Sequence, residues 1–141
     1  MKAKLILRIA SVIMFLHLLG HMVGATTWKT NPDATVQETI KGMTEHSFVF
    51  MGAKQTLAGH HEGYGYAGAL ALLFFSIILW IISNADAQTK SISSKIVLVL
   101  STILLLWGID ELIYFFPFAA AFSLISSVLG FYSLTLLKKL Q

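Results

Sequence analysis

The sequence predicts an all-α membrane protein, a four-helix transmembrane bundle with up-and-down connections. Of its 141 residues, 56% are hydrophobic and 12% are charged, whereas about a quarter of the residues in soluble domains are charged. Its apolar residues gather into four stretches, each near the ~20 residues that a spanning helix needs. Short connections between the later stretches favour neighbouring helices that run up and down. We expect a single domain, residues 1–141, with helices at about 5–25, 63–83, 96–115 and 118–137.

The first predicted helix, residues 5–25, carries His17 and His21 in a run that otherwise belongs in lipid. Residues four apart lie on one face of an α-helix, and ionisable groups at membrane depth face a bundle interior or a cavity. Val23-Gly24-Ala25 also fits the cleavage site of a signal peptide. The apolar stretch is nearer in length to a spanning helix than to a signal core, so we expect it to be retained.

Small residues occur at one end of the first two predicted helices. Gly20 and Gly24 lie near the end of the first helix, and Gly65 and Gly68 lie near the beginning of the second. Glycine faces let helices approach closely in lipid. We therefore expect tight packing between these helices near the histidines, or a homo-oligomer formed through the same glycines.

The connection over residues 26–62 is polar and too long for a simple turn, so we expect it to contain a helix. Asn31 as N-cap and Pro32 as first helical residue predict a helix over 32–43. Its apolar residues recur at helical spacing, which predicts an extracytoplasmic amphipathic helix on the membrane surface or over the bundle. They are Val36, Ile40 and Met43. The apolar run 47–51 is too short to span and is expected to pack against the bundle.

Basic residues at the helix ends predict the topology. They all fall on one side of the predicted bundle, which the positive-inside rule makes cytoplasmic. These residues are Lys2, Lys4, Arg8, Lys90, Lys95, Lys138 and Lys139. We expect both termini in the cytoplasm, the 26–62 connection outside, and a location in a bacterial inner membrane. Because these cations are topology signals in contact with membrane lipid, nucleic acid is not an expected partner.

The unusual polar residues share one depth in the predicted bundle. At about 1.5 Å per residue, His17 and His21 lie ~18 and ~24 Å above the inner end of their helix. Asp110 lies ~21 Å above the inner end of the third helix. The same layer is expected to collect the imidazoles and carboxylates at the outer ends of the second and third helices. These are His60, His61, Glu62 and Glu111.

This layer predicts a metal site. The chain has no cysteine, so any metal must be bound by His, Asp, Glu or Tyr. The expected ligands are His17, His21, His60 and His61, with Glu62, Asp110 and Glu111 as catalytic carboxylates. Zinc or iron with an open coordination position would suit hydrolysis of a lipophilic substrate. Haem b is a less favoured cofactor, because histidines four apart on one helix cannot be its two opposite axial ligands.

Three other interpretations stay open at this point. The protein can be a metal-free binding or transport protein for a small lipophilic molecule, in which the histidines and carboxylates bind the polar head of that molecule or relay protons. The protein can be a non-enzymatic subunit of a membrane complex, attached through its glycine faces. The two histidines of the first helix can also be purely structural, bonded within the bundle. Whether the protein is an enzyme is left open by the sequence.

A resemblance to a known family supports the predicted architecture. Gly20-His21 beside His17, a long connection with Met43, Phe48 and Gly52, and the run 63–65 carry it. In these features the chain resembles a family of small uncharacterised bacterial four-helix integral membrane proteins. The likeness covers most of the first eighty residues, although Gly59-His60-His61-Glu62 replaces the aromatic and acidic residues of that family. It implies the fold and no activity.

Overall fold

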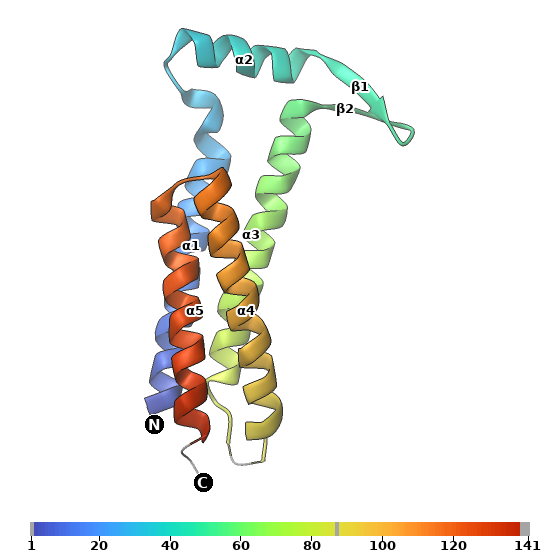
Figure 1. Ribbon diagram of the computed structural model, residues 1–141. Coiled ribbons are helices and arrows are strands. Elements are labelled where there is room, and N and C mark those ends of the chain that lie inside the picture. The colour runs from blue at the N-terminus through green and yellow to red at the C-terminus, as the bar shows by residue number, and fades with distance from the viewer. Residues whose placement is uncertain (1, 87, 139–141) are drawn as a thin grey trace. The chain divides into compact units, whose positions relative to one another are not determined.

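The structure is a computed structural model that describes residues 2–86 and 88–138 (Figure 1). Within these residues, four helices are long and apolar enough to cross a membrane. They are α1 (Lys2–Thr27), α3 (Leu57–Ile82), α4 (Lys90–Tyr114) and α5 (Pro117–Lys138). Between α1 and α3 lie the 3-10 turn η1 (Trp28–Thr30), helix α2 (Ala34–Glu45), and strands β1 (Ser47–Phe50) and β2 (Ala53–Thr56). The prediction of four helices of spanning length is confirmed.

The chain divides into two compact units. The four-helix unit comprises residues 1–19 and 71–141, and the connecting unit comprises residues 20–70. Because α1 and α3 are continuous helices, each contributes residues to both units. Lys139, one of the basic residues used to predict the topology, lies outside the described residues.

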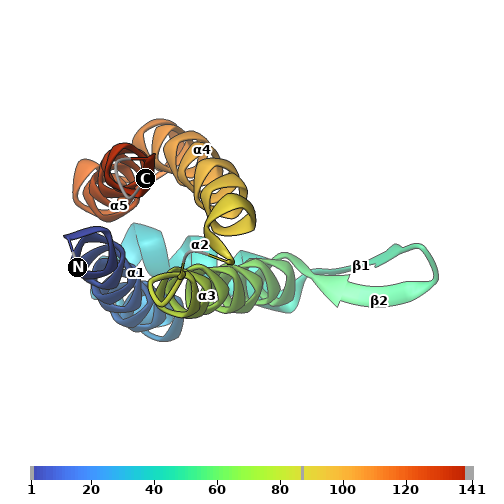
Figure 2. The same cartoon turned by 90° about the horizontal axis from the view of Figure 1, so that it is seen from below.

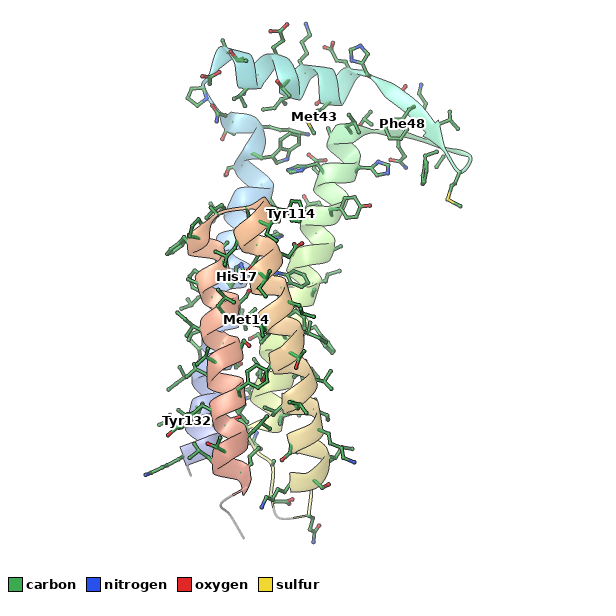
Figure 3. The ribbon with its side chains drawn as sticks, viewed as in Figure 1. Met14, His17, Met43, Phe48, Tyr114 and Tyr132 are labelled. Atoms are coloured by element: carbon green, nitrogen blue, oxygen red, sulfur yellow. The ribbon has the colours of Figure 1, made fainter. Side chains whose placement is uncertain are left out.

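Figure 2 views the helices of the four-helix unit along their length. The core of this unit is built from one stripe of buried residues on each helix. On α1 the buried residues recur every three or four positions, which is the spacing of one helix face. They are Ala3, Leu7, Ala10, Ser11, Met14 and His17. Met14 is fully buried and points into the interior of the unit (Figure 3). His17 therefore extends a buried stripe whose other residues are apolar or small.

Buried serines join neighbouring helices of this unit. The Ser11 hydroxyl donates to the Ser76 carbonyl at 2.7 Å, and the Ser76 hydroxyl donates to the Ser11 carbonyl at 3.0 Å. Ser127 on α5 donates to the carbonyl of Ser101 on α4 at 2.7 Å. Small hydroxyl residues allow helix backbones to approach and supply hydrogen bonds where no water is available. These contacts fix α1 against α3, and α4 against α5.

Close packing of α4 on α5 requires glycine at position 130. A Cβ atom placed there would overlap the Oγ of Ser101. Gly130 is buried on the serine face of α5, so its neighbours have little room to move. The glycine is therefore a packing residue and needs no unusual backbone conformation.

We expect Gly130→Ala to lower the free energy of unfolding by about 1–3 kcal/mol, the usual cost of overpacking a core. Thermal denaturation in a mild detergent measures the effect. Gly42→Ala on α2 is the matched control, because a Cβ there meets nothing within 4 Å and alanine favours a helix. Equal stability of wild type and Gly130→Ala would contradict this packing.

The helix of the connecting unit begins two residues later than predicted, at Ala34 instead of Pro32. Asp33 is the N-cap of α2: its carboxylate accepts hydrogen bonds from the backbone N–H of Thr35 at 2.8 Å and of Val36 at 3.1 Å. Asn31, the predicted cap, instead accepts from the N–H of Asp33 at 2.9 Å. The ionised side chain at the positive end of the helix is the better cap. Of the predicted apolar stripe, Ile40 is buried and Val36 is exposed.

A β-hairpin follows α2, which the sequence did not predict. Strands β1 and β2 pair antiparallel, with Phe50 opposite Ala53. The two turn residues both have positive φ, 51° at Met51 and 84° at Gly52, as type I′ hairpin turns require. The run 47–51 is exposed along its length, and its expected packing against the bundle stays a prediction. Two short paired strands satisfy its backbone without a buried face.

Two of the spanning helices begin before their predicted starts. Helix α3 begins at Leu57 and α4 at Lys90, where the sequence predicted about 63 and 96. Glycine and polar residues at these starts lower the hydropathy but do not end a helix whose later turns are packed. As a result, His60, His61 and Glu62 lie within α3 itself.

The turn before α4 is held by Asp86. Its carboxylate accepts hydrogen bonds from the N–H of Thr89 at 2.9 Å, the Thr89 hydroxyl at 2.8 Å and the N–H of Gln88 at 3.0 Å. These bonds, the Thr89 N–H first among them, lower the pKa of Asp86 below its usual range. A carboxyl with a depressed pKa stabilises the fold above its unfolded pKa, and this contribution is lost as the pH falls through the folded pKa.

Candidate functional site

The four-helix unit contains a buried pair of ionisable side chains, His17 on α1 and Glu111 on α4. Only 4% of His17 and 5% of Glu111 is exposed. Each is placed by helical phase: His17 lies three positions after buried Met14, and Glu111 lies three positions after buried Gly108. Figure 3 shows His17 within the bundle, between the helices of this unit.

The pair is in direct contact. Nε2 of His17 lies 3.1 Å from Oε1 of Glu111. The same carboxylate oxygen accepts a hydrogen bond from the indole N–H of Trp107 at 2.9 Å, one turn earlier on α4. Two nitrogen atoms therefore converge on one carboxylate oxygen.

The other carboxylate oxygen is buried without a partner. Among the described residues, Oε2 of Glu111 is the buried side-chain atom for which no hydrogen-bonding partner is present. Buried polar atoms are nearly always paired, and an exception needs a physical explanation. This oxygen is an open acceptor inside an apolar bundle.

Helix α5 completes the surroundings of His17. The Ser123 hydroxyl lies 3.4 Å from Nδ1 of His17, a long contact in which either atom can donate. The Phe122 ring stacks on the imidazole, with 5.4 Å between centroids and 24° between planes. The imidazole thus has a carboxylate at one nitrogen, a hydroxyl near the other and an aromatic ring on one face.

His21 makes its contact within the connecting unit. Its Nε2 lies 2.7 Å from the carbonyl oxygen of Gly65 on α3. A Cβ at Gly68 would lie 3.2 Å from the His21 ring, and one at Gly65 would lie 3.3 Å from the Cβ of Ala25. These two glycines thus let α1 and α3 approach within this unit. Nothing lies within 4 Å of a Cβ at Gly20 or Gly24, so their predicted role in an oligomer stays a prediction.

The predicted ligands at the start of α3 have other partners. His60 is surrounded by aromatic rings, with centroid distances of 5.5 Å to Phe48 and 6.4 Å to Tyr64. His61 and Trp28 pack edge to face, with 4.5 Å between their ring centroids. Glu62 forms an ion pair with Lys29, at 2.6 Å between Oε1 and Nζ. These contacts pack the first turns of α3 against η1 and β1 in the connecting unit.

Asp110 is exposed, and its predicted role in the site stays a prediction. Adjacent residues of an α-helix point about 100° apart, and on α4 it is Glu111 that points inward. Depth along the helix alone could not distinguish these two acidic residues. Counting the buried stripe of α4 forward from Val97, Leu100 and Leu104 distinguishes them.

The sequence also missed Phe122 and Ser123 as neighbours of the histidine. Their signal lay in α5, where small polar residues recur on one face of an apolar helix. These residues are Ser123, Ser126, Ser127 and Ser133, all fully buried.

No group of three or more His, Asp or Glu side chains in residues 2–86 and 88–138 is arranged to hold a metal ion. His17 and Glu111 are the predicted site residues that the structure brings into contact across two helices. A metal or haem bound by the four histidines stays a prediction.

Comparison with known proteins adds no functional assignment. No family model, curated protein or solved structure matches the chain. The resemblance to a bacterial membrane protein family stays a prediction.

We expect His17 and Glu111 to be energetically coupled. Either alanine substitution leaves its partner buried and unpaired, whereas the double substitution removes both groups at once. A double-mutant cycle of thermal stability in detergent should therefore give a coupling energy of about 1–2 kcal/mol. His17→Ala combined with Asp110→Ala should be additive. Additive effects at His17 and Glu111 would contradict the contact.

Proposed function

We propose that the protein binds and releases protons at the buried His17–Glu111 pair. The observation that carries the proposal is the unpaired, buried Oε2 of Glu111. An ionised carboxylate oxygen in this state has lost its water without compensation. A proton is the smallest group that removes this cost, and it requires no opening in the packed bundle.

The pair offers two places for protons. The first proton is held between Nε2 of His17 and Oε1 of Glu111, which lie 3.1 Å apart. With Nδ1 of His17 protonated, this shared proton leaves the two side chains without net charge together, as imidazolium and carboxylate or as imidazole and carboxyl. A second proton on Oε2 leaves an imidazolium beside a neutral carboxyl, so the interior gains one positive charge. A change of charge at membrane depth is the property on which proton relays depend.

Trp107 and Ser123 act as positioning residues in this proposal. The Trp107 indole N–H donates to Oε1 at 2.9 Å and thereby fixes the carboxylate toward the histidine. Ser123 lies 3.4 Å from Nδ1, where its hydroxyl can accept when that nitrogen carries a proton. The imidazole can therefore stay paired at both nitrogens as its protonation changes.

The proposed setting is a four-helix transmembrane bundle with up-and-down connections in a bacterial inner membrane. With four spans, both termini lie on one side, and the lysines and arginines at the helix ends make that side cytoplasmic. Arg8 on α1 supports a shared inner level for α1 and α3: it lies 3.4 Å from Ser83 and from Asn84, just beyond α3. The α2 helix and the hairpin then lie on the outer side.

Infrared pH-difference spectra of the protein in bilayers test the proton site. We expect a band from a buried carboxyl group that disappears in Glu111→Gln and persists in Asp110→Asn, the adjacent exposed carboxyl. His17→Gln should move the midpoint of this band, since the imidazole contacts the same carboxylate. A difference spectrum unchanged by Glu111→Gln would overturn the proposal.

Metal analysis of the same samples tests the metal-site alternative. Stoichiometric zinc or iron in the wild type that is lost in His17→Ala would favour the metal site instead of the proton site. Metal-free wild type with an intact carboxyl band would support the proton site.

A further inference from the structure

The connecting unit exposes consecutive apolar side chains at its hairpin. At the hairpin, 73% of Val49, 58% of Phe50 and 92% of Met51 is exposed. These residues are consecutive, so both faces of the two-stranded ribbon present apolar side chains near its tip. Exposed apolar surface of this kind marks a site of contact with another molecule or a membrane.

The turn itself favours an apolar environment for the tip. Met51 has a φ of 51°, the left-handed region, and turns of this type strongly prefer Asn, Asp or Gly at such a position. A long apolar side chain is held there in an unfavourable backbone conformation and almost completely exposed. Polar turn chemistry would suit water, whereas methionine suits a lipid environment.

A groove adjoins the hairpin within the connecting unit. It has a volume of about 410 Å³. Its walls come from the hairpin and from the first turns of α3, and glycine lies on its floor. The residues used here are Phe50, Gln55, His60, Gly63, Tyr64 and Ala67. A Cβ at Gly63 would meet nothing within 4 Å, so the floor is open space.

The groove adjoins the start of a candidate membrane span. Strand β2 ends at Thr56 and α3 begins at Leu57, which is also where the candidate membrane span begins. The groove residues of α3 therefore lie in the first turns of a spanning helix, at the level of the bilayer surface. Tyrosine is characteristic of this level, and 75% of Tyr64 is exposed.

Polar groups border the same groove. Gln55 and His60 line the groove, whereas Lys54, next to Gln55 on β2, is exposed and lies on the opposite face of the strand. An amide and an imidazole beside an apolar channel can donate hydrogen bonds to the phosphate of a headgroup joined to acyl chains.

We propose that the groove between the β1–β2 hairpin and the start of α3 binds one phospholipid of the adjacent leaflet. Its acyl chain lies over Gly63 between Phe50 and Tyr64, and its phosphate faces Gln55 and His60. Met51 and Val49 enter the same leaflet and hold the hairpin against the membrane. This site is separate in its residues from the His17–Glu111 pair, so either proposal can fail without the other.

Photocrosslinking of the full-length protein in nanodiscs tests this site. The probe is a phosphatidylethanolamine with a photoreactive diazirine in its acyl chain, and adducts are mapped by mass spectrometry. In the wild type we expect adducts concentrated at residues 48–51 and 63–67. Gly63→Leu fills the groove and should lose the adducts at 63–67, whereas Gly42→Leu, which also has free space around its Cβ, should keep them.

Two further variants keep the test decisive. Met51→Asn suits the turn and removes the apolar tip, so adducts at 48–51 should be lost while the helical circular dichroism is retained. If Gly63→Leu does not fold, Tyr64→Ala removes one wall and should lose the adducts at 63–67. Equal groove adducts in wild type and a folded groove variant would overturn the proposal. So would crosslinks between two copies at the hairpin without lipid adducts, because a second chain would then cover this surface.

Discussion

The pairing of an imidazole with a carboxylate inside an apolar bundle is the constraint on which the rest of the four-helix unit depends. Neither His17 nor Glu111 can be buried alone without a large desolvation cost, and the 3.1 Å contact between them offsets part of it. A pair of apolar side chains of similar volume would pack at least as well. The presence of the costlier pair at membrane depth therefore points to a function that requires ionisable groups.

This pair needs helices that approach closely and hold their rotation. The serine contacts between α1 and α3, and between α5 and α4, fix the rotation of each helix. Gly130 allows the α4–α5 approach, since any side chain there would overlap Ser101. The same rotation that buries Glu111 leaves Asp110 exposed, so helix packing selects which of two adjacent acids meets the histidine.

The sequence predicted the parts of the fold that composition controls. Four long apolar stretches are sufficient to place four helices, and the His17 and His21 spacing is sufficient to place both on one helix. The sequence could not predict the partners of these histidines. Nε2 of His21 contacts a backbone carbonyl, and every residue type has such a carbonyl. The hairpin was missed because each strand has only four residues and the second, Ala53–Thr56, has no alternating apolar pattern. The choice of Glu111 over Asp110 required the phase of the whole helix.

A solid-state NMR distance measurement in lipid bilayers tests the contact between His17 and Glu111 directly. The protein carries ¹⁵N in histidine and ¹³C in the carboxyl groups of glutamate and aspartate. The pairing predicts strong dipolar dephasing of Nε2 of His17 by the carboxyl carbon of Glu111, assigned by its loss in Glu111→Gln and its retention in Asp110→Asn. Dephasing that survives Glu111→Gln, or a His17 side chain with no carboxyl carbon nearby, would contradict the account.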